Sequence, residues 1–349
     1  MQVLLVKNDR EKKAFTDFRK KLYMGDPFYV STAEFTFEML LNKETAFAKT
    51  LDVCPVMGIE NGKIVVEALL IRNPKDDFLQ VSFFEAVENA FDEVEFFMSF
   101  VKDFTLKKGL RRIIIGLNGH LSYGVGLAEN MNRPNTFDST YSKPYYARYF
   151  KNYVKHELFA FSNSPSAVLK ELPERNSSVT IRKIDFKHFD EEAETFRKIC
   201  NETIGSTFLF TQTDKGHFYD LLKPMTFFLK PENILFAEKD GEVVGFVFWH
   251  PDYNEVLKTG RKNSLATIAV RYLLFKNKIK RVKLNSIGIK EKYRGAVTVE
   301  LLRAVGKLVG NYETLETNFV WGNNKKSIAI NRHLLKNVER KFAVYEVNL

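Results

Sequence analysis

The strongest constraint on the fold is a β-hairpin pattern that occurs once in each half of the chain. In the second half, the β-rich runs 234–238 and 243–249 flank an Asp-Gly pair, and in the first half the runs 56–59 and 64–70 flank an Asn-Gly pair. Both dipeptides supply the positive φ angles that a tight turn requires. The sequence therefore predicts two antiparallel hairpins, one in each half.

The patterns that follow the two hairpins are also alike. Strand and helix patterns lie at 79–84, 94–104 and 111–115 in the first half, and at 282–289, 297–308, 314–320, 327–337 and 342–347 in the second. We interpret this as a degenerate internal duplication. The predicted fold is α/β (α+β), with two tandem domains at 1–165 and 178–349, each a mixed, mostly antiparallel sheet flanked by helices. The join falls in the turn-rich segment 162–178.

Composition places the chain among globular proteins with a core, because 45% of its 349 residues are hydrophobic and 28% are charged. Two cysteines are too few for a disulfide framework, and no Cys and His residues have zinc-site spacing, so we expect no metal. The apolar start at 1–6 is too short for a signal peptide, and no later run reaches the roughly 18 residues of a membrane span. We therefore expect a soluble, cytoplasmic protein.

The positive charge of the chain is concentrated in one segment. Residues 256–290 contain ten Lys and Arg residues and no acidic residue, which equals the net charge of +10. Such a field favours an anionic partner, namely a nucleotide-like cofactor, a nucleic acid or an anionic membrane surface, and the alternative is a solvated basic face. The apolar stretch 265–275 within it predicts a helix, either packed between the domains, which we favour, or lying on the acceptor groove or a membrane.

A possible phosphate-binding turn follows the strand pattern at 282–289. The run 292–297 reads Lys-Tyr-Arg-Gly-Ala-Val and opens a helix, where free backbone amides and the helix dipole attract phosphate. Here the sequence resembles the GNAT acyltransferase superfamily, and within it bacterial proteins with two GNAT-like domains in tandem. The resemblance extends over nearly the whole chain and includes the segments 18–27 (with Leu-Tyr-Met-Gly-Asp-Pro), 141–146 (Tyr-Ser-Lys-Pro-Tyr-Tyr) and 324–328 (Asn-Lys-Lys-Ser-Ile).

The resemblance implies an acyl-coenzyme A co-substrate, such as acetyl-CoA, bound by the second domain. It assigns Arg294, Gly295 and Ala296 to the diphosphate. It assigns Ile287, Gly288 and Ile289 to the pantetheine arm, and Asn324 to the same groove. In the first half the corresponding run, 84–93, has no glycine and four carboxylates, which would repel a diphosphate. We therefore interpret the first domain as a structural or substrate-shaping partner that binds no cofactor.

Two positions depart from the family pattern. Val297 replaces the second glycine of the loop, and Asn331 stands where many GNAT enzymes have a tyrosine that protonates the leaving thiolate. A side chain in such a loop can block the close approach of backbone to phosphate. Both departures favour the alternative of a GNAT-fold protein without catalytic activity.

Four residues are candidates for catalysis. His250 can act as a base near neutral pH, and Asp252 can orient it or bind an amine. Glu202 can bind an amine through water, and Asn285 can orient a water or the acyl oxygen. For each, the structural alternative is the end of a strand, an exposed helix end or a polar residue on a bulged strand.

The function that we predict is transfer of an acyl group, in the first place acetyl, from coenzyme A to the amine of a small molecule or peptide. One alternative is a transferase that uses aminoacyl-tRNA and holds RNA through 256–290. The other is an inactive GNAT-fold protein that binds a ligand, RNA or a membrane surface. The sequence predicts neither the acceptor nor the oligomeric state.

Overall fold

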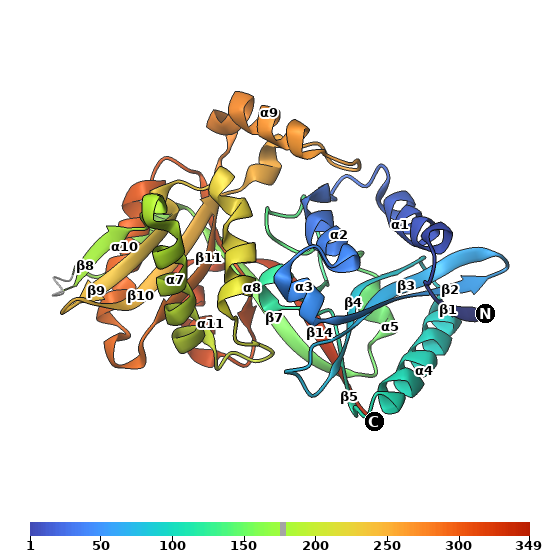
Figure 1. Cartoon of the computed structure of the whole chain (residues 1–349). Coiled ribbons are helices and arrows are strands. Elements are labelled where there is room, and N and C mark those ends of the chain that lie inside the picture. Colours follow the sequence, from blue (N-terminus) through green and yellow to red (C-terminus); the bar gives the residue numbers. More distant parts are fainter. Residues whose placement is uncertain (175–178) are drawn as a thin grey trace. The chain divides into compact units, whose positions relative to one another are not determined.

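The protein is described by a computed structural model, in which residues 1–174 and 179–349 are described. The chain forms two compact units (Figure 1). The first unit contains Met1–Leu158, Leu257–Leu274 and Arg340–Leu349, and the second contains Phe159–Val256 and Phe275–Glu339. Each unit is a mixed sheet flanked by helices, which confirms the predicted fold class.

The first unit is built on a sheet whose strand order is β1, β2, β3, β4, β5, β14. These strands are β1 (Gln2–Leu5), β2 (Asp52–Glu60), β3 (Lys63–Arg72), β4 (Leu79–Ala86), β5 (Arg112–Ile115) and β14 (Asn337–Asn348). Only the β4–β5 pair of this order is parallel. The β2–β3 hairpin turns at Asn61 and Gly62, both of which have positive φ, as the sequence predicts.

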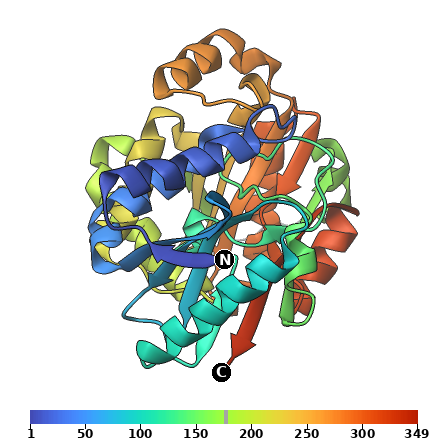
Figure 2. The same ribbon diagram turned by 90° about the vertical axis from the view of Figure 1, so that its right-hand side faces the viewer.

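Helices cover both faces of this sheet (Figure 2). They are α1 (Asp9–Tyr23), α2 (Glu34–Asn42), α3 (Ala46–Thr50), α4 (Phe91–Lys107) and α5 (Tyr146–Tyr149), and a short strand, β6 (Leu127–Ala128), pairs with β14. Val66, Ala68 and Leu70 of β3 form one apolar core with the buried face of α4. Because side chains alternate along a strand, Glu67 points to the opposite face.

The second unit repeats the arrangement, with strand order β7, β12, β11, β10, β9, β8. These strands are β7 (Val154–Asn163), β12 (Thr314–Thr317), β11 (Arg281–Ile289), β10 (Glu242–Pro251), β9 (Ile234–Lys239) and β8 (Thr180–Lys183), with β13 (Val320–Trp321) beside β7. The parallel pair is β11–β12, and the β9–β10 hairpin confirms the second predicted hairpin. The helices are α6 (Pro165–Glu171), α7 (Phe189–Ile204), α8 (Lys215–Leu222), α10 (Ala296–Val309) and α11 (Lys325–Leu334). One core forms beneath α10 and a separate one beneath α7 and α8.

The closing strands of the two halves are exchanged. Ser162 and Asn163, at the end of the first half, pair with β12 of the second unit, whereas Tyr345–Asn348 of β14 pair with β5 of the first unit. The compact units therefore do not coincide with the predicted ranges 1–165 and 178–349, because a hydrophobic pattern predicts a strand but not its partner. The described part of the predicted join, 162–174, ends β7 and forms α6, and 175–178 lie outside the described residues.

The basic segment contains the predicted helix, α9 (Leu265–Phe275). The residues before this helix pack within the first unit, where the Gly25 amide donates to the Gly260 carbonyl at 2.9 Å and the Asn263 amide donates to Ser31 Oγ at 2.8 Å. Among the described helices, none combines the length and the apolar character that crossing a membrane requires.

Candidate functional sites

In the second unit, the pairing between β11 and β12 ends part-way along β11, in the region predicted to hold the acyl carrier. The parallel ladder between β11 and β12 ends at the pair Leu284 and Thr317, and the Asn318 amide then donates to the Leu284 carbonyl at 2.8 Å. β11 continues for five more residues with β10 on its other edge. Ile287, Gly288 and Ile289 lie on this continuation, with Asn285 at its start. The backbone of β11 beyond Leu284 is thus suited to pair with an extended ligand.

The chain leads from β11 through a short turn into α10. Gly295 precedes this helix with φ of 96°, and a Cβ added there would meet no atom within 4 Å. The Arg294 side chain is 54% exposed, and Ala296 is the first helical residue. Val297 is buried in the core beneath α10, so the side chain that interrupts the glycine pattern points away from the turn. The first-turn amides remain a suitable site for an anion.

Two asparagines on α11 have structural bonds. Asn324 is the N-cap of the helix, and its Oδ1 accepts the Ser327 amide at 3.1 Å. Asn331 Nδ2 donates to the Ser327 carbonyl at 2.8 Å. Asn324 would therefore keep this capping bond while it serves its predicted role at the groove.

The environment of His250 does not suit a general base. The imidazole is fully buried, lies parallel to the Tyr253 ring at 5.9 Å and has Nδ1 2.9 Å from the Pro251 carbonyl oxygen. Burial, assisted by Lys283, lowers its pKa to about 3, so the ring is uncharged and only weakly basic at neutral pH. Asp252 is 4% exposed, and its Oδ1 accepts the Asn254 amide at 3.2 Å, as in a turn.

Glu202 lies on α7, and its carboxylate is 3.0 Å from Lys290 Nζ, which follows β11. Lys290 also pairs with Glu242 at 2.5 Å. Glu202 is 53% exposed, so this ion pair is screened by solvent. The four candidates for catalysis thus all lie in the second unit, and their roles in catalysis stay predictions.

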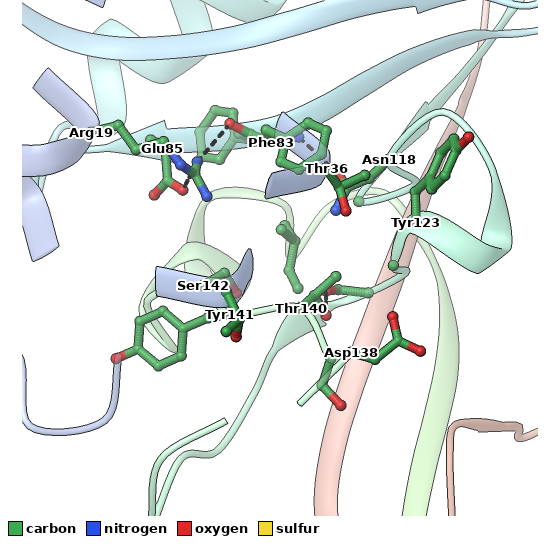
Figure 3. A pocket seen from close by; sticks show the side chains of 17 residues that line it. Arg19, Thr36, Phe83, Glu85, Asn118, Tyr123, Asp138, Thr140, Tyr141 and Ser142 are labelled. Carbon is green, nitrogen blue, oxygen red and sulfur yellow. Dashed lines mark hydrogen bonds and ion pairs between the residues drawn. The ribbon is translucent and has the colours of Figure 1, made fainter. Parts of the chain in front are cut away.

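A pocket that sequence reasoning missed lies in the first unit (Figure 3). It contains about 630 Å³ of space, its open mouth included, and is lined by residues of α1, β4, the α2 region and the loop segments 116–126 and 138–142. It lies where β4 separates from β5. Phe83, with φ of 49°, interrupts the β3–β4 register there, and its amide donates to Asn118 Oδ1 at 2.9 Å.

The floor of this pocket is a buried carboxylate, Glu85 of β4, which is 1% exposed. Its Oε2 accepts the hydroxyls of Tyr23 at 2.5 Å and Tyr146 at 2.6 Å, and its Oε1 accepts Nη1 of Arg19. Arg19 Nε also donates to Glu34 Oε1 at 2.7 Å. The Arg19 guanidinium therefore shares its charge between the carboxylates of Glu34 and Glu85 in a site with little solvent.

Two acids in this cluster have perturbed protonation. Burial raises the pKa of Glu85 to about 7, against the opposing charge of Arg19. Glu67, directly opposite Glu85 on β3, is completely buried, and burial raises its pKa well above the usual value. Within the described part of the chain, neither carboxylate oxygen of Glu67 has a hydrogen-bond partner. Burial without a partner therefore favours the uncharged form of Glu67.

Two of the segments that carried the family resemblance, 18–27 and 141–146, meet beside this pocket. Asp26, in the Leu-Tyr-Met-Gly-Asp-Pro segment, accepts the hydroxyl of Tyr141 at 2.8 Å and pairs with Lys143. Tyr23 and Tyr146 of the same two segments both donate to Glu85. The resemblance identified these motifs, but their sequence positions gave no sign that they hold one buried carboxylate.

Tyr149 of α5 and Tyr145, the residue before this helix, bind the backbone where β4 leads into α4. Tyr145 and Tyr149 donate to the carbonyls of Ala86 and Val87 at 2.8 and 2.6 Å, and the Ala90 amide donates to Tyr149 at 3.3 Å. These backbone groups follow β4 and precede α4, as the residues of the predicted carrier site follow β11 and precede α10. Their engagement gives a physical reason, besides the four carboxylates, for interpreting the first unit as one without a bound cofactor.

Comparison with known proteins places this geometry in a fold family. No family model matches the sequence. A bacterial ceramide synthase from Caulobacter vibrioides is 28% identical over 154 residues, a match that covers 41% of this chain and 40% of that protein. The structure resembles a tandem GNAT protein from the clavulanic acid biosynthesis pathway, with a TM-score of 0.57, 9% identity and coverage of 99% and 98%. It also resembles a conserved protein of unknown function from Enterococcus faecalis V583, with a TM-score of 0.55, 9% identity and coverage of 99% and 72%. With its two mixed sheets, each of which contains one parallel strand pair, the chain has the tandem GNAT fold.

Proposed function

We propose that the protein is an N-acyltransferase that moves an acyl group from a coenzyme A thioester to an amine. The observation that carries the proposal is the end of the β11–β12 ladder at Leu284 and Thr317, beyond which β11 continues, together with the glycine turn that starts α10. Support also comes from the partial match to a ceramide synthase, since a ceramide is the amide of an acyl group and a long-chain amino alcohol. We extend the proposal to a lipid-like acyl group or acceptor on that basis.

For this acyl transfer, the main contribution of the protein is to position the reactants. Amides of the first turn of α10 and the Arg294 guanidinium are suited to the carrier diphosphate, and the empty space at Gly295 leaves room for close approach. The thioester supplies an activated carbonyl, and amides of β11 are suited to bind its oxygen as negative charge develops. The amine nitrogen attacks the carbonyl carbon, so that the C–N bond forms and the C–S bond breaks, and one proton of the amine passes to the sulfur, which leaves as the thiol. Holding the two groups together accounts for much of the rate.

The test is to follow thiol release with acetyl-CoA and palmitoyl-CoA, each with serine, a peptide amine and sphinganine as acceptors. We expect Arg294→Ala to raise KM for the thioester about tenfold with kcat little changed, because a charge-assisted contact to the carrier is lost. Lys307→Ala is the matched control, since Lys307 is an exposed cation in the last turn of the same helix. Equal KM values for the two variants, or no turnover and no binding of either thioester, would contradict the proposal.

We also propose that α9 binds an anionic membrane surface. Val270, Leu273 and Leu274 of this helix are 54%, 63% and 69% exposed, and Lys276 and Lys278, just after it, are exposed as well. Exposed apolar side chains beside cations are the composition of a helix that lies on a charged bilayer. A lipid-like substrate would be reached from such a surface.

Co-sedimentation with vesicles tests this second function. We expect binding to vesicles that contain phosphatidylglycerol, weaker binding to pure phosphatidylcholine, and loss of binding in the double variant Leu273→Glu, Leu274→Glu. The control is Leu308→Glu with Ile330→Glu, which adds the same charge at exposed apolar positions on α10 and α11. Protein that stays in the supernatant with both vesicles, or that binds RNA in their place, would refute the membrane role.

A further inference from the structure

The pocket of the first unit has no part in the proposed transfer, although it is built around buried charge. Its floor is formed by Arg19 and Glu85, which are 2% and 1% exposed. Burying a charge is costly unless it is paired and hydrogen-bonded, and a structural pair would gain nothing from opening onto a cavity. A purely structural role of this ion pair therefore does not explain the cavity beside it.

Arg19 has donor capacity that the protein does not use. Its Nε donates to Glu34 and its Nη1 to Glu85 and the Phe83 carbonyl, while Nη2 has no acceptor among the described residues. Figure 3 shows one nitrogen of this guanidinium directed into the pocket. A donor that faces the pocket without a protein acceptor can donate to a ligand oxygen placed there.

The charges around the pocket exclude an anionic ligand. Arg19 is the one cation among the described lining residues, against the carboxylates of Glu85 at the floor and Asp138, which is exposed. The positive charge of Arg19 is also shared with Glu34, outside the lining. The excess of negative charge attracts a cation and would repel a carboxylate or phosphate.

Most of the remaining polar wall consists of hydroxyl groups, beside the amide of Asn118. These hydroxyls belong to Thr32, Thr36, Tyr123, Ser139, Thr140, Tyr141 and Ser142, several of which, among them Thr140, Tyr141 and Ser142, also bond to the protein. A hydroxyl both donates and accepts a hydrogen bond, so a wall of this kind is complementary to the hydroxyl groups of a ligand. Thr36 is a clean probe of the wall, because its hydroxyl has no protein partner in the part of the chain that the structure describes.

From these observations we propose that the first-unit pocket binds a small cationic amine that also carries hydroxyl groups, that is, an amino alcohol. Arg19 Nη2 donates to a ligand oxygen, the carboxylates of Glu85 and Asp138 attract the ammonium group, and the hydroxyl wall binds the remaining oxygens. The inference concerns binding in the first unit alone, so it does not depend on acyl transfer by the second.

Isothermal titration of the full chain with 2-amino-1,3-propanediol tests the proposal directly. The titration is done at pH 8, above the value of about 7 to which burial raises the pKa of Glu85, so that this carboxylate is ionised. Glycerol, glycerate and serine are compared with it, because they have a similar size and are neutral, anionic and zwitterionic. We expect the amino diol to bind about tenfold more tightly than each of them. Equal or tighter binding of any of the three, or no binding of the amino diol, overturns the proposal.

Variants assign the binding to this pocket. Glu85→Gln and Asp138→Asn are expected to weaken binding of the amino diol about tenfold and about threefold, and Thr36→Val about threefold. Asp138 is exposed, so its variant stays informative if the change at Glu85 disturbs folding. Glu95→Gln removes an exposed carboxylate of α4 and is expected to leave the affinity unchanged. Binding that survives both carboxylate changes at the pocket would show that the amine binds elsewhere and would refute the inference.

Discussion

Replacing Glu85 by glutamine is expected to change how the stability of the protein depends on pH. Burial raises the pKa of this carboxyl from 4.5 to about 7, while Arg19 opposes the shift. The folded state therefore binds the proton more tightly than the unfolded state. The resulting stabilisation is complete below the unfolded value of 4.5 and is lost as the pH rises through about 7. Glutamine has nearly the same shape and does not titrate, so the variant lacks this loss.

The size of the effect follows from the shift. A shift of about 2.5 pKa units corresponds to about 3.4 kcal/mol at 1.36 kcal/mol per unit, and about 2.5 kcal/mol of this lies between pH 5 and pH 8. Losing the hydrogen bonds of the carboxylate adds an offset that does not depend on pH. The free energy of unfolding of the variant, relative to the wild type, should thus rise by about 2 to 3 kcal/mol from pH 5 to pH 8.

Urea unfolding at several pH values, followed by far-UV circular dichroism, measures this difference. Tryptophan fluorescence serves as an internal comparison, because Trp249 and Trp321 both lie in the second unit, whereas Glu85 lies in the first. Glu95→Gln, an exposed carboxylate on α4, should give a profile parallel to the wild type. Parallel profiles for wild type and Glu85→Gln would refute the reasoning, since they would mean that Glu85 is ionised equally in both states.

Further predictions concern packing and reactivity. Gly288→Ala would place a Cβ 2.1 Å from Thr203 Oγ1, and we expect it to destabilise the second unit by about 1 to 3 kcal/mol in thermal unfolding, whereas an unchanged Tm would mean that α7 can move away. Tyr146→Phe removes a bond to Glu85 and should cost about 1 to 3 kcal/mol in urea unfolding, and no loss would show that water replaces the hydroxyl. Because burial raises the pKa of Cys200 well above its usual value, this thiol should react with a disulfide reagent only on unfolding, and rapid labelling of Cys200, as distinct from the half-buried Cys54, in the native protein would contradict its burial.

Much of the architecture could be predicted from local sequence patterns. The turn pairs Asn61-Gly62 and Asp240-Gly241 predict hairpins that the structure contains, and the apolar stripe of α10 predicts a helix with the correct buried face. These signals are local, because turn geometry and the periods of strand and helix involve only neighbours along the chain. The duplication and the fold class follow from their order.

The partners of the closing strands and the pocket of the first unit were decided only by the tertiary structure. An apolar run at 342–347 predicts a strand, but nothing in it indicates that β14 pairs with β5 of the other half. Arg19, Glu67 and Glu85 lie on three separate elements, and each looks like an ordinary surface residue until the sheet and α1 bury them together. Burial and the pKa shifts that it causes depend on contacts between distant segments, so no local pattern of residues encodes them.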